Sequence, residues 1–424
     1  MPVTEHGVKL AAVEQAFRSL PDRYLGAQPG FAASYRIRLG DLGRVWEVRA
    51  DARTVRVANG TTRRRPDVTI STDAETWLAL RQGAFSGVDA FRRRRLAVRG
   101  NLDLAIAFEG LFRLPNGRPP LLHIRDVGVG RHRVSTLTMG QGDDVLLIHG
   151  LGGTRASMFD TAAALSRRYR VHAVDLPGFG SSSKPAMGRY NAGWFSDIML
   201  ALMDELGIGR AHLVGNSMGG RIAIEMGLRA PERVRSLGLL CPAVAWVRRG
   251  LHPIVRLLRP EFGLLPHNFT RAMVAGQFWD LFYDRDAIDP AVGDMIVDEF
   301  RRIYHSAGAR YAFLACARNI YLERPFGRGG FYPRLAELAP PALFIWGSDD
   351  PLVPHAFSRH VGRWLAGAEQ ITLPECGHLP QVEHPEETNA LLNAFFARVE
   401  GSGLRRHAAA RGLSEPRPAD SEAA

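Results

Sequence analysis

The first hundred or so residues alternate apolar and polar positions in short runs. This two-residue period is typical of a sheet with one face in water, and the predicted strands are 34–39, 45–49, 54–57, 67–71 and 96–99. Helical periods predict helices at 8–20, 74–81, 88–94 and 101–112. Residues 1–113 are therefore predicted to form a small α+β domain. The proline- and glycine-rich stretch 114–120 is predicted to be an extended linker.

From residue 121 the pattern changes to near-continuous apolar runs separated by helical segments. The predicted parallel strands are 144–149, 170–175, 210–215, 236–241, 341–346 and 369–373, after an antiparallel strand at 131–139. Helices between them include 192–206 and 384–399. Strands without a polar face are buried on both sides, so residues 121–400 are predicted to form an α/β domain with a doubly wound, mostly parallel sheet.

About ninety residues separate the strand that ends near Val244 from the one that begins near Ala342, which is too long for a bare loop. A helical cap is predicted over 245–335, where fifteen aromatic residues favour an apolar pocket. Within it, residues 246–258 are basic and amphipathic, a pattern that suits a membrane surface or the roof of a pocket. The tail 401–424 lacks an apolar period and is predicted to be disordered.

The most informative motif is the sequence from Gly215 to Gly219, with Ser217 at its centre, between a predicted strand and a predicted helix. A tight strand-to-helix turn of this kind strains the serine backbone and needs small residues on both sides. A serine hydroxyl becomes a useful nucleophile only when a base takes its proton, and a carboxylate orients that base. Downstream, two strands end in Asp349-Asp350 and in Gly377-His378.

These motifs resemble the α/β-hydrolase superfamily over about residues 121–400. The matching stretches are His149-Gly150, 175–182, 215–219, 346–350 and 377–380. The resemblance implies that Ser217 is the nucleophile, Asp350 the acid and His378 the base, in the chain order of that fold.

The same resemblance implies an oxyanion hole made by the backbone N–H groups of Leu151 and Met218. It selects Asp350 rather than Asp349, because the acid of the family stands four residues before the second proline of the turn. His149 is expected to brace its loop through hydrogen bonds, and Asp175 is expected to be structural.

A serine at this position implies a cofactor-independent serine hydrolase, without a metal, that cleaves an ester or thioester with an apolar acyl or alcohol part through an acyl-enzyme. It argues against haloalkane dehalogenases and epoxide hydrolases, whose covalent esters need an aspartate there. Carbon–carbon bond hydrolysis, acyl transfer and perhydrolysis use the same three residues and stay open as alternatives.

The first domain resembles the sterol-carrier-protein fold over about residues 8–113. The resemblance rests on 66–71, 77–80 and 96–105, where a strand, a helix and a basic strand lead through a glycine into a last helix. It implies an apolar tunnel for lipid tails. A solid domain that mediates dimerisation or supports the enzyme is the alternative. A lipid-binding or transfer protein is the rival function from another class.

Charge and cysteine content limit the possible partners and the cellular compartment. The net charge is +11 with 54 basic residues, almost all of them arginine, and this skew indicates codon bias rather than a binding surface. The clusters 63–65 and 92–95 are expected to be solvated, or to attract anionic lipid or acidic partners. No nucleic-acid motif is present, so no nucleic-acid partner is expected. Three scattered cysteines and no signal-like apolar run predict a cytoplasmic protein. Peripheral membrane contact and a homodimer stay open.

Overall fold

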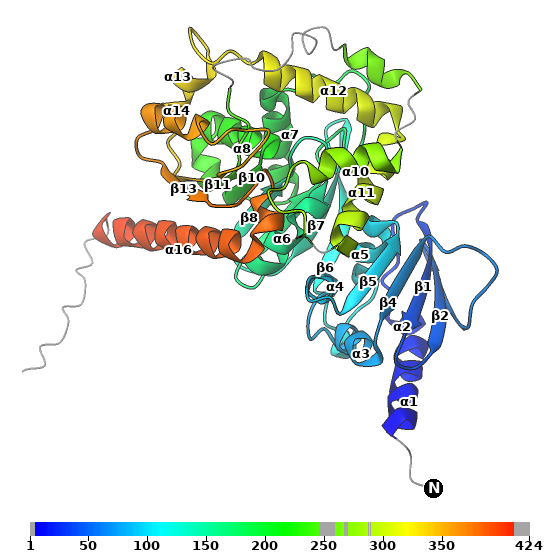
Figure 1. Ribbon diagram of the computed structural model, residues 1–424. Helices are drawn as coiled ribbons and strands as arrows, with labels where there is room; N and C mark the ends of the chain where they lie inside the picture. The colour runs from blue at the N-terminus through cyan, green and yellow to red at the C-terminus, as the bar shows by residue number, and fades with distance from the viewer. Residues whose placement is uncertain (1–4, 246–258, 267–269, 287, 289, 411–424) are drawn as a thin grey trace, which may run out of the picture.

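The computed structural model describes residues 5–245, 259–266, 270–286, 288 and 290–410 (Figure 1). The chain forms a five-stranded sheet near its N-terminus and an eight-stranded sheet after it. Both sheets carry helices, as expected for an α+β unit followed by a doubly wound α/β unit. Among the helices that the structure describes, none combines the length and the apolarity needed to cross a bilayer.

The N-terminal domain has a mixed sheet with strand order β3-β2-β1-β4-β5. Its strands are β1 (Ala32–Leu39), β2 (Arg44–Asp51), β3 (Val55–Asn59), β4 (Val68–Thr72) and β5 (Leu96–Gly100). Its helices are α1 (Glu5–Arg18), α2 (Leu20–Arg23), α3 (Ala74–Gln82), α4 (Gly87–Arg92) and α5 (Leu102–Gly110). Only β1 and β4 pair in parallel among these strands, and the alternating burial along β1 matches its predicted period.

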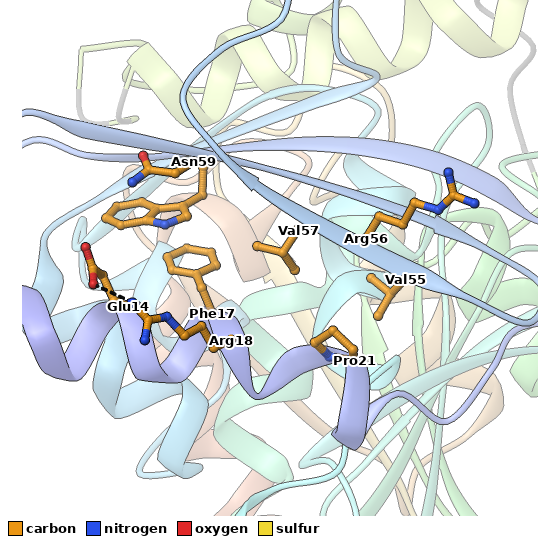
Figure 2. Close-up of a pocket in the computed structure, with 9 residues that line it drawn as sticks. Glu14, Phe17, Arg18, Pro21, Val55, Arg56, Val57 and Asn59 are labelled. Atoms are coloured by element: carbon orange, nitrogen blue, oxygen red, sulfur yellow. Dashed lines mark hydrogen bonds and ion pairs between the residues drawn. The ribbon is translucent and has the colours of Figure 1, made fainter.

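Aromatic rings fill the interior of this domain. The ring of Phe17 on α1 stacks on Trp46 at 4.5 Å and on Trp77 at 4.6 Å between centroids. Beside this stack, a hollow of about 490 Å³ lies between α1 and β3 (Figure 2). In the view of Figure 2, Val55 and Val57 reach from the strand toward Pro21 and Phe17, and charged and polar side chains form the rim.

The second sheet has the order β13-β12-β11-β10-β8-β9-β7-β6. Its strands are β6 (Leu122–Val129), β7 (His132–Met139), β8 (Asp144–Ile148), β9 (Arg170–Val174), β10 (Ala211–Asn216), β11 (Val234–Leu240), β12 (Ala342–Gly347) and β13 (Glu369–Leu373). Strand β7 pairs antiparallel with both of its neighbours, β6 and β9, and all the other neighbouring strands pair in parallel. Strand β6 was not predicted from the sequence.

Helices cover both faces of this sheet. They are α6 (Phe159–Leu165), α7 (Ala192–Glu205), α8 (Met218–Arg229), α14 (Phe357–Trp364), α15 (Pro380–Glu383) and α16 (Pro385–Ala410). One apolar cluster contains α7 and α8, and another contains α6 and the start of α16. Helix α16 runs to Ala410, so the predicted disorder is wrong over 401–410; this stretch is rich in alanine and arginine, which favour helices.

The predicted cap is helical in its described part. It contains the 3₁₀ turn η4 (Pro260–Leu264) and the helices α10 (Arg271–Trp279), α11 (Pro290–Tyr304), α12 (Ala307–Leu322) and α13 (Phe331–Leu335). Figure 1 shows α11 between α12 and the N-terminal domain. The basic amphipathic stretch 246–258 lies outside the described residues.

The two domains share an apolar core. Val88, Leu102 and Ile106 of the N-terminal domain belong to the same buried cluster as Leu137 and Phe159 of the hydrolase sheet and its helix α6. Shared burial of this kind favours a fixed orientation, because separating the domains would expose apolar surface to water.

Candidate active site

Ser217 sits in a tight turn between β10 and α8, with φ 52° and ψ −115°. The tight turn leaves no room for a Cβ atom at the positions two residues before and two residues after Ser217, where glycine stands. A Cβ on Gly215 would lie 2.4 Å from the carbonyl carbon of Gly219, and a Cβ on Gly219 would lie 2.1 Å from the oxygen of Ile148. The main-chain N–H of Ser217 donates to the oxygen of Leu240 at 2.9 Å. The turn therefore has the geometry of a nucleophile elbow.

The side chains of Asp350 and His378 form a buried hydrogen-bonded pair. Nδ1 of His378 lies 2.8 Å from Oδ2 of Asp350. The other carboxylate oxygen accepts from the main-chain N–H groups of Leu352 at 2.8 Å and Val353 at 2.9 Å. A carboxylate with all of these donors fixes the imidazole with its proton on Nδ1, which leaves Nε2 free to take a proton.

Asn216 joins the elbow to the loop of His378. Its Nδ2 donates to the main-chain oxygens of Leu240 at 3.1 Å and of His378 at 3.2 Å. Oγ of Ser217 makes no hydrogen bond with another described residue, and the serine is 9% exposed. Catalytic hydrogen bonds are often longer in an unliganded enzyme than in its substrate complex.

The loop after β8 lies against the elbow. His149 is buried; its Nε2 accepts from the main-chain N–H of Leu176 at 3.0 Å and its Nδ1 donates to the oxygen of Gly150 at 2.8 Å. Burial lowers the pKa of His149, so the ring is neutral and braces the loop as expected. A Cβ on Gly150 would lie 3.2 Å from Cβ of Ser217, which places Leu151 close to the nucleophile.

Met218 follows the nucleophile as the first residue of α8 and is 3% exposed. Its main-chain N–H is one of the first of the helix, where no carbonyl of the helix itself can accept it. The two predicted oxyanion donors thus lie on two segments that meet at Ser217.

Asp175 holds the surrounding loops together. Its carboxylate accepts from the main-chain N–H groups of Arg155 and Ser181, both at 2.9 Å, and lies 3.1 Å from the guanidinium of Arg155. Arg155 begins the 3₁₀ helix after the loop of Gly150, and Ser181 lies in the loop after β9, so Asp175 joins two connecting segments, in agreement with the structural role expected for it.

Aromatic rings of the cap cover the loop that carries Leu151. A Cβ on Gly152 would lie 2.7 Å from Oη of Tyr304, 3.2 Å from Phe313 and 3.4 Å from Phe300. A second group of apolar side chains comes from α10, α11 and the segment between them, including Phe278 and Phe282, and packs with Leu379 directly after His378. Any substrate that reaches Ser217 between these elements meets apolar surface.

Glu383, which was not predicted from the sequence, joins the loop of His378 to the cap. Its Oε2 accepts from the N–H of Gly377 at 2.7 Å, and its Oε1 accepts from Tyr283 at 2.8 Å and Asp284 at 3.0 Å. One carboxylate thereby ties the loop of His378 to the segment after α10. The N–H of His378 also donates to the oxygen of Leu281 at 2.8 Å.

Cys241, Asp350 and His378 bring three potential metal-ligand atoms within 4.8 Å of one another. Burial, reinforced by the charge of Asp350, raises the pKa of the Cys241 thiol well above its ordinary value. A protonated thiol is a poor ligand, and Nδ1 of His378 already donates to the carboxylate. The donor set therefore fits a metal ion poorly.

Residues 144–385 match the alpha/beta hydrolase fold family, and residues 14–113 match the SCP-2 sterol transfer family. A pimeloyl-(acyl-carrier protein) methyl ester esterase of Aeromonas hydrophila is 30% identical over 62% of this chain and 98% of its own length. A 2-hydroxymuconate semialdehyde hydrolase of Pseudomonas putida is 29% identical over 65% of this chain and 95% of its own.

Among solved structures, a bacterial membrane phospholipase A aligns with a TM-score of 0.55 and 27% identity, over 66% of this chain and 87% of that one. The family match, the elbow and the doubly wound sheet agree with one another. The chain therefore belongs to the α/β-hydrolase family and is a hydrolase with an SCP-2 domain at its N-terminus.

Proposed function

We propose that this protein is a serine hydrolase that cleaves an ester or thioester with an apolar acyl or alcohol part. The observation that carries the proposal is the 2.8 Å hydrogen bond between His378 and Asp350 beside a strained nucleophile elbow. In the proposed reaction, Nε2 of His378 takes the proton of Ser217 as Oγ attacks the carbonyl carbon.

The tetrahedral intermediate carries its negative charge on the former carbonyl oxygen. The N–H groups of Leu151 and Met218 are proposed to donate to that oxygen, and one such donor is typically worth about 2.7–4 kcal/mol. His378 then gives its proton to the leaving group as the carbon–oxygen or carbon–sulfur bond breaks. Water, deprotonated by the same imidazole, releases the acid from the acyl-enzyme.

The apolar substrate preference rests on the cap. Phe300, Tyr304 and Phe313 lie against Gly152, and Phe282 shares an apolar cluster with Leu379. Such walls bind alkyl or aryl groups through burial rather than through charge. One relative is named as the esterase of a pimeloyl-(acyl-carrier protein) methyl ester, which supports an ester with an alkyl acyl part as the substrate here.

An ester chain-length series tests the proposal. The Ser217→Ala variant should lose on the order of a millionfold in kcat on p-nitrophenyl esters and should no longer react with a fluorophosphonate probe. Ser402→Ala, at an exposed serine on α16, is the matched control and should keep both activities. Turnover that survives in Ser217→Ala would refute the assignment.

Carbon–carbon bond hydrolysis is the second candidate within this fold, because a relative that is 29% identical is named a 2-hydroxymuconate semialdehyde hydrolase. A dienoic keto acid assayed beside the esters separates the two functions. Faster turnover of the keto acid than of every ester would replace the ester proposal while leaving Ser217 essential.

Lipid binding by the N-terminal domain is a candidate function of another class. The hollow beside Phe17 has an apolar floor and a volume of about 490 Å³, within the usual range for ligand pockets. Titration of the full chain with a fluorescent fatty acid tests it, with Val57→Asp as the blocking variant. Binding that Val57→Asp leaves unchanged would place the lipid elsewhere.

A further inference from the structure

One carboxylate of the N-terminal domain reaches both the oxyanion loop and the cap. Asp103 lies in the first turn of α5, and its side chain is 15% exposed. Its Oδ1 accepts from Arg155 at 2.6 Å. Its Oδ2 accepts from the hydroxyl of Ser181 and from Arg302 at 3.2 Å. All three partners belong to the hydrolase domain and its cap.

Arg155 begins the 3₁₀ helix η2 (Arg155–Met158), one residue beyond the loop of Gly150 to Gly153. Its guanidinium is almost fully buried, between Asp103 and Asp175, and its main-chain N–H donates to Asp175 at 2.9 Å. A buried guanidinium that loses one carboxylate partner is strongly destabilised where it stands. Asp103 therefore helps to fix the residue that ends the oxyanion loop.

Arg302 belongs to the cap helix α11, where it also pairs with Glu299 at 2.5 Å. Phe300 and Tyr304, two residues to either side, lie against Gly152. Two residues along a helix correspond to a rotation of about 200°, so Arg302 and these rings leave opposite sides of α11. The helix is thus held by the N-terminal domain on one side and packs on the oxyanion loop with the other.

The charge on Asp103 suits this arrangement. Burial by itself raises the pKa of this carboxyl, but Arg155, the Ser181 hydroxyl and Arg302 together keep it below its ordinary value. Asp103 is therefore ionised at neutral pH and forms ion pairs with both Arg155 and Arg302.

We propose that Asp103 is a positioning residue of the hydrolase active site. Through it, the N-terminal domain holds both the oxyanion loop and the cap helix α11 in the positions that catalysis requires. This inference rests on the proposed function of Ser217. It assigns to the N-terminal domain a role in the hydrolysis itself, separate from any lipid that the domain binds.

The test uses the full chain and two variants of the domain interface. Asp103→Asn keeps the shape of the side chain and removes its charge. Arg92→Gln is the matched control, because Arg92 joins α4 to Asp160 of α6 at 3.0 Å and to Glu386 of α16 at 3.9 Å, and among the described residues it has no ion pair with α11 or the oxyanion loop. Each variant is assayed on a short and a long p-nitrophenyl ester, and its thermal unfolding is recorded.

Asp103→Asn should lower kcat on the short ester by about tenfold, since small displacements of catalytic groups have effects of that size or larger. It should also raise KM for the long ester, because α11 forms the wall against which a long chain packs. Arg92→Gln should leave kcat and KM within about twofold. Equal kinetic losses in both variants, in step with their unfolding temperatures, would overturn the inference.

Arg302→Gln covers the case in which Asp103→Asn does not fold, because Arg302 is 38% exposed and Asp103 keeps its ion pair with Arg155 in this variant. It should raise KM for the long ester while leaving the short ester less affected, and an unchanged KM would also refute the inference. Active Ser217→Ala would refute the proposed function. Inactive Ser217→Ala together with normal Asp103→Asn kinetics would refute only the role of Asp103.

Discussion

Nδ2 of Asn216 lies 3.2 Å from the main-chain oxygen of His378, so the side chain next to the nucleophile supports the loop of the base. The same amide donates to Leu240, at the end of the neighbouring strand. The spacing between Ser217 and His378 is thus set by a residue that takes no part in proton transfer.

Asn216→Asp should therefore impair catalysis while preserving side-chain size. The new oxygen cannot donate to the two carbonyls and would repel them, and a buried polar group left unpaired costs about 1–3 kcal/mol. We expect kcat on a short ester to fall at least tenfold. Asn393→Asp on α16, where Nδ2 donates within its own helix at 2.9 Å, is the control and should keep normal kcat. Normal kcat in Asn216→Asp would show that the contact is dispensable.

Glu383→Ala should loosen the loop of His378 from the cap. Three main-chain N–H groups, of Gly377, Tyr283 and Asp284, would lose their acceptor. Without Glu383, the loop of His378 and the cap segment after α10 can both shift. In steady-state assays we therefore expect kcat to fall, because the base is displaced, and KM for a long ester to rise, because the cap is displaced. Glu387→Ala, at an exposed glutamate of the next helix, provides the comparison. Identical kinetics for the two variants would contradict the role of Glu383.

Gly219→Ala should prevent folding of the elbow. The added methyl group would lie 2.1 Å from the main-chain oxygen of Ile148, which cannot move without breaking the sheet. Overpacking against backbone of this kind should cost at least about 3 kcal/mol in the free energy of unfolding. Gly209→Ala meets nothing within 4 Å and should leave the midpoint of thermal unfolding nearly unchanged. A soluble Gly219→Ala with a normal midpoint would be inconsistent with the turn described here.

Glu109 should make the stability of the N-terminal domain depend on pH. This carboxyl is buried, accepts from the N–H of Gly87 at 2.6 Å, and has its pKa raised to about 7 by burial. The folded state therefore binds the proton more tightly than the unfolded chain. The stability contributed by protonation is fully present below the ordinary glutamate pKa of about 4.5 and is lost as the pH rises through about 7.

Hydrogen exchange of the α5 amides at pH 5 to 8 measures this effect. Protection should fall over that range in the wild type, after correction for intrinsic exchange, and Glu109→Gln should flatten the curve. Glu75→Gln, at an exposed glutamate, should retain the fall. A wild-type curve that is already flat would contradict the raised pKa.

Local patterns predicted most of the fold and the hydrogen-bonded pair. The elbow could be recognised because the tight turn at Ser217 needs a glycine two residues before it and two residues after it. Both glycines fall within the five-residue motif 215–219. The Gly377-His378 and Asp349-Asp350 turns follow predicted strands, whose carboxyl ends meet at one sheet edge. Strands β8 to β13 were found within one or two residues because their apolar runs are continuous.

Strand β6 was not predicted because the positions of its apolar residues switch from one face of the strand to the other partway along it. Leu122 faces one apolar cluster, whereas Val127 and Val129 face the cluster on the other side of the sheet. Glu383 and Asp103 were missed for a different reason. Glu383 contacts Tyr283 and Asp284 about 100 residues away, and the partners of Asp103 lie about 50 to 200 residues away along the chain. No local hydrophobic period in the sequence indicates contacts over such separations.

The three-way contact of Asp103 with Arg155 and Arg302 has a consequence for how such fusions can arise. An unrelated domain joined in front of this hydrolase would leave the guanidinium groups of Arg155 and Arg302 without the carboxylate of Asp103, so the exchange would need compensating changes in the hydrolase domain. Across descendants of one ancestral fusion, an acidic side chain at 103 and the two guanidinium groups should be gained or lost together.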